Sequence, residues 1–217
     1  MSKVVNYSMA NRGAVLRFLP AVDLSADESR RLGNMRRSAR ERQDSLDYQE
    51  VDWGLSVPDA LEDLIAGRAD SRAEYAGSAY FAALQIIIDH NASDPSTLGS
   101  YRSPVTFFSH LDGALSRAGV PEELLSWQYI FSGPPSEIGF PIPRPVDGSP
   151  EIGCWPLAKA GPAVEAYRAV LDRIDPELRY DLEELIKALD DWASEWNEGQ
   201  GAWWWAEDGS IFFSITG

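Results

Sequence analysis

The longest uncharged stretch of the chain runs from Tyr75 to Ile88. It is fourteen residues long and lies between Glu74 and Asp89, whereas charged residues make up 24% of the whole chain. Because no face of this segment carries a charge, we expect a helix that is buried on every side. Such a helix would span about 21 Å, which is short of the roughly 30 Å hydrocarbon core of a bilayer. The pattern therefore predicts a core helix within a globular domain.

Amphipathic patterns predict further helices on both sides of this segment. Residues 24–43 carry six arginines, with apolar residues spaced along one helical side. We interpret this segment as a surface helix, with a docking face for an acidic partner or for the acidic C-terminal helix as the alternative. Two more helices are expected over residues 56–67 and 103–119, because Ser56 and Ser103 each stand at a helix start beside an early proline.

The clearest amphipathic helix lies near the C-terminus. Asp175-Pro176-Glu177 ends a helix over residues 161–174 and begins the next one. Leucines, Trp192 and Trp196 share the apolar side of this second helix. Its opposite side carries the acidic residues Glu183, Glu184, Asp190, Asp191 and Glu195. We expect that acidic side to face water, because an amphipathic helix buries only its apolar stripe.

Strand patterns occur at both ends of the chain and in its middle. The opening residues 3–9 and the run Trp127–Phe131 are rich in residues that favour strands. At the C-terminus, Glu207-Asp208-Gly209 separates Trp203–Trp205 from Ser210–Ile215, which predicts a hairpin.

In the hairpin's expected register, Trp205 lies opposite Ile211. Trp203 and Trp205 would then face the core, because successive strand residues point to opposite faces. Trp204 and Phe212 would share a more polar face with Ala206 and Ser214, and we expect that face to meet solvent or a partner.

A proline-rich segment interrupts these elements at residues 133–156, which hold seven of the fourteen prolines. Neither a helix nor a central strand tolerates that composition, so we expect a loop that serves as a wrapped connector or a binding loop. The elements together predict one α+β domain over residues 1–217. It would be mostly helical, with a small mixed or antiparallel sheet that includes the N-terminal strand and the C-terminal hairpin.

Charge restricts the possible partners. The chain has 19 Lys and Arg against 34 Asp and Glu, a formal charge of -15. This charge repels phosphate backbones and anionic lipids, so we expect neither nucleic acid nor membrane as a partner. The single cysteine, Cys154, cannot form an internal disulfide, and the N-terminus has no long apolar run typical of a signal peptide. We therefore expect a cytoplasmic protein.

Motifs for catalysis or cofactor binding are not found in the sequence. His90 and His110 lack the spacing of a zinc site, and each is expected to be a hydrogen-bonded structural residue. No local signature marks Cys154 as a nucleophile, and neither G-x-S-x-G nor a glycine-rich nucleotide motif occurs. We expect no metal and no cofactor.

The order of elements and three short motifs resemble a known family. The motifs are Tyr75-Ala76-Gly77-Ser78-Ala79-Tyr80, Phe131-Ser132-Gly133-Pro134-Pro135 and Trp155-Pro156-Leu157. With the opening strand, the closing helices and the final strand, this order resembles the YfbM-like family of uncharacterised bacterial proteins. The resemblance implies a single α+β domain and brings no known catalytic residues.

Two functional hypotheses follow. The first is a non-enzymatic intracellular binding protein, similar to an immunity protein or antitoxin, that holds a basic protein partner. Its contacts would come from Trp204 and Phe212 together with Glu184, Asp191 and Glu195.

The alternative is a small-molecule-binding domain or enzyme. Its pocket would lie between the helix over residues 75–88 and the proline-rich segment. Tyr75, Tyr80, His90 and Trp155 would contribute to it.

Overall fold

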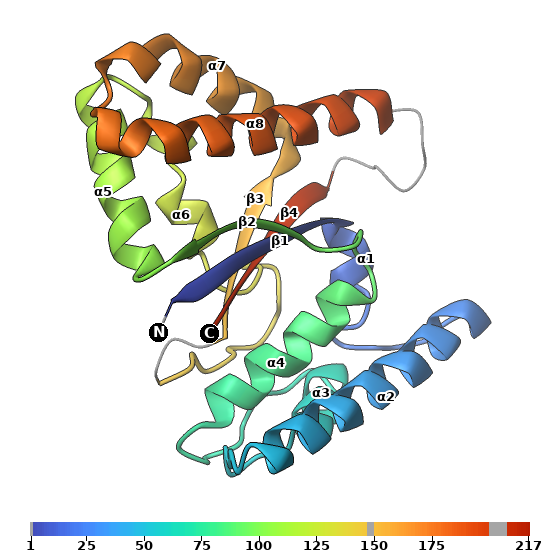
Figure 1. Cartoon of the computed structure of the whole chain (residues 1–217). Coiled ribbons are helices and arrows are strands. Elements are labelled where there is room, and N and C mark those ends of the chain that lie inside the picture. Colours follow the sequence, from blue (N-terminus) through green and yellow to red (C-terminus); the bar gives the residue numbers. More distant parts are fainter. Residues whose placement is uncertain (1, 147–149, 200–207) are drawn as a thin grey trace.

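A four-stranded antiparallel sheet lies between two helical layers in the computed structural model, which describes residues 2–146, 150–199 and 208–217 (Figure 1). The strands follow the spatial order β2-β1-β4-β3 and are Lys3–Asn11 (β1), Ser96–Tyr101 (β2), Glu151–Pro156 (β3) and Gly209–Thr216 (β4). The predicted α+β class, mostly helical with a small sheet, is confirmed.

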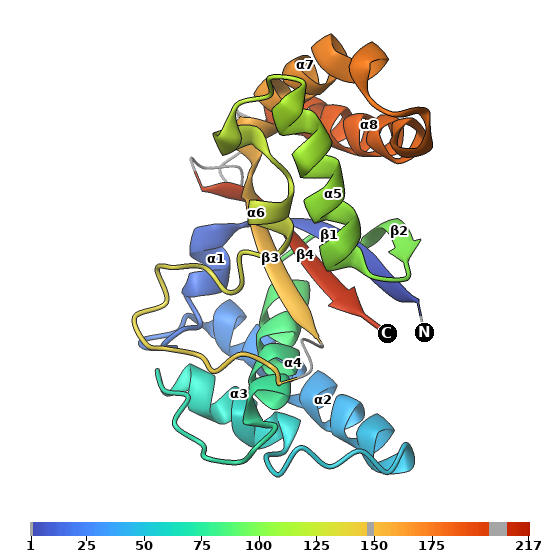
Figure 2. The same ribbon diagram turned by 90° about the vertical axis from the view of Figure 1, so that its left-hand side faces the viewer.

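The helices separate into two groups by chain position. They are Arg12–Leu16 (α1), Ala26–Tyr48 (α2), Val57–Ile65 (α3), Ala76–Asp89 (α4), Pro104–Arg117 (α5), Trp127–Ile130 (α6), Ala160–Val170 (α7) and Pro176–Gly199 (α8). Helices α1 to α4 cover one face of the sheet, and α5 to α8 cover the other (Figures 1 and 2). None of the described helices is long and apolar enough to cross a membrane.

The strand β4 contributes to both hydrophobic cores. Ile211 and Phe213 point into the core beneath α8, where the ring centroids of Phe213 and Trp192 lie 5.9 Å apart. Phe212 points to the opposite face and is only 1% exposed, packed under the α1 to α4 layer. The prediction that Phe212 meets solvent or a partner is therefore wrong, because both faces of the sheet are covered by helices.

The predicted C-terminal hairpin is also wrong. The strand β4 pairs with β1 along one edge and with β3 along the other. Ile211, expected opposite Trp205, lies opposite Met9 of β1 and Trp155 of β3. Both edges of β4 are therefore occupied by strands other than the predicted hairpin partner. Trp203, Trp204 and Trp205, on which the expected register was built, lie outside the described residues.

Two local predictions in the middle of the chain fail for tertiary reasons. The run Trp127–Phe131 was expected to be a strand but forms the short helix α6. The proline-rich segment, expected to be a loop without a helix or a central strand, ends in the strand β3. This strand lies at the edge of the sheet, and Pro156 is its last residue, a place where the missing N–H is tolerated.

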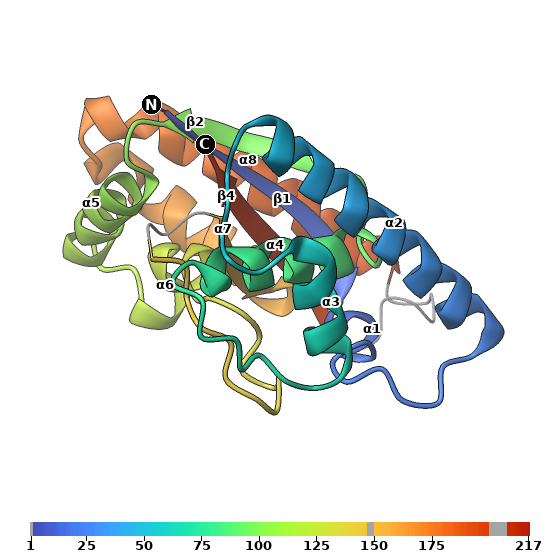
Figure 3. The same ribbon diagram turned by 90° about the horizontal axis from the view of Figure 1, so that it is seen from below.

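The core helix α4 matches its prediction. Its residues 76–84 and 86–88 are buried on all sides. The proline-rich segment crosses its first turn at Gly77, where an added Cβ would overlap the carbonyl group of Arg144. Figure 3, seen from below, shows α4 lying across the strands of the sheet with α3 and α2 beside it. The backbone of the proline-rich segment can approach α4 closely because residue 77 has no side chain.

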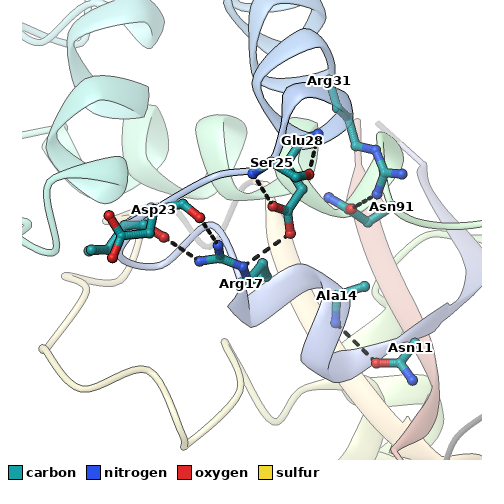
Figure 4. Close-up of polar contacts among 9 residues, drawn as sticks. Asn11, Ala14, Arg17, Asp23, Ser25, Glu28, Arg31 and Asn91 are labelled. Carbon is teal, nitrogen blue, oxygen red and sulfur yellow. Dashed lines mark hydrogen bonds and ion pairs between the residues drawn. The ribbon is translucent and has the colours of Figure 1, made fainter.

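The arginine-rich helix α2 is anchored by its own neighbours. Ser25 and Glu28 form a capping box at its start, and Glu28 also pairs with Arg17 at 3.0 Å (Figure 4). Arg31 donates to Asn91, and Arg36 pairs with Glu62 of α3. The surface-helix prediction is confirmed. Docking onto the acidic C-terminal helix is wrong, because α2 and α8 lie on opposite sides of the sheet.

A pair of glycine substitutions tests the contact at Gly77. We expect Gly77→Ala to lower the free energy of unfolding by ~1–3 kcal/mol, because the methyl group would push the proline-rich segment away from α4. Gly33→Ala in α2 is the control: its Cβ meets no atom within 4 Å, and we expect it to stabilise by ~0.5–1 kcal/mol. Urea denaturation measures both values. Equal effects of the two substitutions would contradict the close contact.

Candidate functional site

A half-open pocket lies where α4, α6 and the proline-rich segment meet. Its cavity volume is about 160 Å³. The described residues that line it come from five parts of the chain: Phe81 of α4, Val105 of α5, Trp127 and Phe131 in and after α6, Gly133, Arg144 and Pro145 of the proline-rich segment, and Glu151 and Ile152 of β3. Most of this lining is apolar, with one arginine and one glutamate.

The buried carboxylate of Asp112 on α5 fixes the position of Trp127. Its Oδ1 accepts from the backbone N–H of Ser126 at 3.0 Å and from the Ser126 hydroxyl at 2.8 Å. Its Oδ2 accepts from the backbone N–H of Trp127 at 2.7 Å. Burial raises the pKa of Asp112, while these hydrogen bonds act in the opposite direction. The carboxylate thus caps α6 and explains why this strand-like sequence is helical.

The pocket collects apolar side chains that remain open to solvent. Trp127 is 40% exposed and Val105 is 42% exposed, and both line the cavity. The ring centroids of Trp127 and Phe131 lie 5.7 Å apart with an interplanar angle of 34°. Exposed apolar residues are ordinary when isolated, but a cluster of them around a cavity marks a binding site.

The guanidinium of Arg144 stands at the same pocket. The backbone of Arg144 packs against Gly77. The Nη2 atom of Arg144 lies 3.5 Å from the point that a Cβ on residue 133 would occupy. Gly133 has a φ of +85°, and its N–H donates to the carbonyl of Ile152 at 3.0 Å. Within the described part of the chain, Arg144 has no hydrogen-bond or ion-pair partner, whereas Arg17 and Arg36 pair with carboxylates. The Arg144 side chain is thus the positively charged group of the described pocket lining.

None of the four residues predicted for a pocket is among the described residues that line this cavity. Tyr80 is fully buried in α4, donates to Asp63 at 2.8 Å and accepts from the N–H of Ser71. Burial raises its pKa, so it is a neutral structural group at physiological pH. Tyr75 precedes α4 and is 40% exposed.

His90 and Trp155 also have structural surroundings. His90 follows α4, and its Nε2 lies 3.0 Å from the Ser38 hydroxyl of α2. Burial lowers its pKa, which favours the neutral imidazole. Trp155 is fully buried on β3, and its ring stacks on Tyr129 at 4.7 Å. His90 thus joins two helices, and Trp155 belongs to the core.

The acidic and aromatic residues of the first hypothesis are not brought together. Glu184 and Asp191 are exposed on α8. Phe212 is buried on the opposite face of the sheet from α8. Trp204 and the side chain of Glu195 lie outside the described residues.

Metal and thiol chemistry find no support in the described geometry. The described residues contain no group of three His, Cys, Asp or Glu side chains placed to hold a metal ion. Burial raises the pKa of the Cys154 thiol to about 11, so this residue is protonated at neutral pH.

Sequence reasoning missed the pocket residues Phe81, Val105, Trp127, Arg144 and Glu151. Each follows the local pattern of its own element, and none belongs to a recognisable motif. The one available signal was the proline- and glycine-rich composition of residues 133–156, which marked the segment as a possible binding loop.

Replacing Asp112 tests how Trp127 is held. We expect Asp112→Asn to lower the free energy of unfolding by ~1–3 kcal/mol, because an amide NH₂ would face an N–H donor in place of a carboxylate oxygen. Asp44→Asn on the exposed surface of α2 is the control, with an expected change within ~0.5 kcal/mol. Chemical denaturation measures both. If Asp112→Asn leaves the free energy of unfolding unchanged, the carboxylate does not anchor α6.

Comparisons with known proteins add one finding. A family model described as "Domain of unknown function (DUF7691)" matches residues 1–214. No curated protein and no solved structure matches the chain. The resemblance to the YfbM-like family stays a prediction, because this match does not link the two families. Since the match covers nearly the whole sequence, the chain belongs to the DUF7691 family of domains of unknown function.

Proposed function

We propose that this protein binds a small molecule in the pocket between α4, α6 and the proline-rich segment. The observation that carries the proposal is a cavity of about 160 Å³ with apolar walls, two partly exposed apolar side chains and two charged groups. Ligand sites in proteins combine a mostly apolar lining with a few polar groups that orient the ligand. A cavity of about 150 Å³ is known to hold benzene, so the apolar part fits one aromatic ring.

The pocket is held open by backbone constraints. The proline-rich segment is held against α4 at Gly77 and connects to β3 through the hydrogen bond from Gly133 to Ile152. Asp112 fixes α6 from the other side. A site whose walls are already ordered loses little entropy when a ligand binds, which supports binding at this place.

Blocking the mouth of the pocket tests this proposal. We expect ligand-observed NMR with a library of small aromatic compounds to identify binders of the wild-type protein. Val105→Trp should abolish most of that binding, because an indole ring would occupy the mouth of the cavity. Val22→Trp is the matched control, since Val22 is 57% exposed in the segment before α2. Compounds that bind the wild type and Val105→Trp equally would contradict the site, as would the absence of any binder.

A second candidate is binding of a basic cytoplasmic protein, as an immunity protein or antitoxin would do. Its support is the exposed acidic side of α8, where Glu183, Glu184 and Asp191 have no ion-pair partner among the described residues. The net charge of -15 adds long-range attraction for a basic surface.

Charge reversal tests the second candidate. Affinity capture from a cytoplasmic extract, followed by mass spectrometry, would identify the partner. We expect Glu184→Lys with Asp191→Lys to slow its association, because opposite charges steer the encounter. Glu41→Lys with Asp44→Lys on α2 carries the same change in net charge and is the control. Equal association rates for the two double variants would remove the α8 face from consideration.

A further inference from the structure

We propose that the ligand of this pocket is a free aromatic α-amino acid, an inference that rests on the small-molecule function proposed above. Its ring would lie in the apolar cavity beside Trp127 and Phe131. Its α-carboxylate would pair with Arg144, and its α-ammonium group would pair with Glu151.

The apolar half of the site fits one aromatic ring. Phe81, Phe131 and Ile152 form walls on which an aromatic face can pack, and Trp127 offers a partly exposed indole. Aromatic pairs prefer tilted or offset arrangements with centroids 4.5–7 Å apart. Trp127 and Phe131 already adopt such an arrangement, and a ligand ring beside them would extend it.

The charged half of the site carries one group of each sign. Arg144 and Glu151 are the charged residues among the described lining. A guanidinium matches the two oxygens of a carboxylate, and it has no other partner among the described residues. Glu151 also interacts within the protein, but a carboxylate has about four acceptor positions and can receive a ligand ammonium as well. A ligand with both charges would satisfy both residues.

The charge of the whole protein favours a zwitterion over a simple acid. At a net charge of -15, the long-range field repels any anion that approaches. An amino acid has no net charge at neutral pH, so it meets no such repulsion while still presenting a carboxylate to Arg144. A simple amine would be attracted but would leave the arginine without a counter-charge.

Calorimetric titration with matched compounds tests the inference in the wild-type protein. The probes are L-phenylalanine, 3-phenylpropionate without the ammonium group, phenethylamine without the carboxylate, and L-alanine without the ring. We expect L-phenylalanine to bind at least about tenfold more tightly than each of the other three, because each lacks one of the three interactions.

Two variants assign the charges to their residues. Arg144→Met should lower the affinity for L-phenylalanine by about tenfold or more, because the contact with the carboxylate is lost. It should leave the affinity for phenethylamine unchanged, because that compound has no carboxylate. Glu151→Gln should lower the affinity for L-phenylalanine, because the contact with the ammonium group is lost. It should not lower the affinity for 3-phenylpropionate, which has no ammonium group. Unfolding midpoints measured for both variants check that each is folded. The comparison of the four compounds in the wild type needs no variant.

The outcomes separate this inference from the function on which it rests. If neutral aromatic compounds bind in a manner that Val105→Trp abolishes, but L-phenylalanine binds no better than its analogues, the pocket is a ligand site and the amino-acid inference is overturned. If L-phenylalanine binds equally well to Val105→Trp, or does not bind at all, the inference is overturned as well. The aromatic library then decides the pocket function independently.

Discussion

The position of β4 in the middle of the sheet is the constraint on which the rest of the structure depends. This strand is paired on both edges and covered on both faces, so every side chain from Ile211 to Phe213 has a fixed place in one of the two cores. The last strand in the chain thus joins the first, β1, to β3. The helices of the N-terminal half then lie on one face, and those of the C-terminal half lie on the other. Each half needs β4 to complete its core.

The pocket is a consequence of how the two layers are connected. The chain passes from α6 on one face of the sheet to α4 on the other face. It then returns to the sheet as β3 (Figure 2). Gly77 permits the close crossing, Gly133 accepts a positive φ at the turn into the segment, and Asp112 fixes the end of α6. These contacts leave an apolar cavity at the point where the segment changes sides. The proposed binding site therefore coincides with the structural constraints, which is the usual arrangement for a preorganised site.

The proposed pocket carries one charge of each sign on a mostly apolar lining, Arg144 and Glu151. Some arginines, such as Arg17, Arg36 and Arg168, are paired with carboxylates of the same chain, whereas others, such as Arg37 and Arg102, have no described partner, like Arg144. Such pairs at an exposed surface contribute little to stability, and they neutralise the arginine charge locally. Arg144 retains its charge beside exposed aromatic surface. The proposed ligand would supply a counter-charge to this arginine.

The sequence by itself determined the elements whose signals are local and strong. The charge-free run of α4, the capping box of α2 and the apolar stripe of α8 each define a helix without help from distant residues, and together they specify an α+β domain. Only the tertiary structure decided the rest. The run Trp127–Phe131 became a helix because Asp112, fourteen residues before Ser126 in the chain, caps it. Phe212 became buried because a second helical layer covers its face, and β4 had no edge for a hairpin because β3 occupies it. The pocket is lined by five elements spread from Phe81 to Ile152, and no local pattern encodes the distances between them.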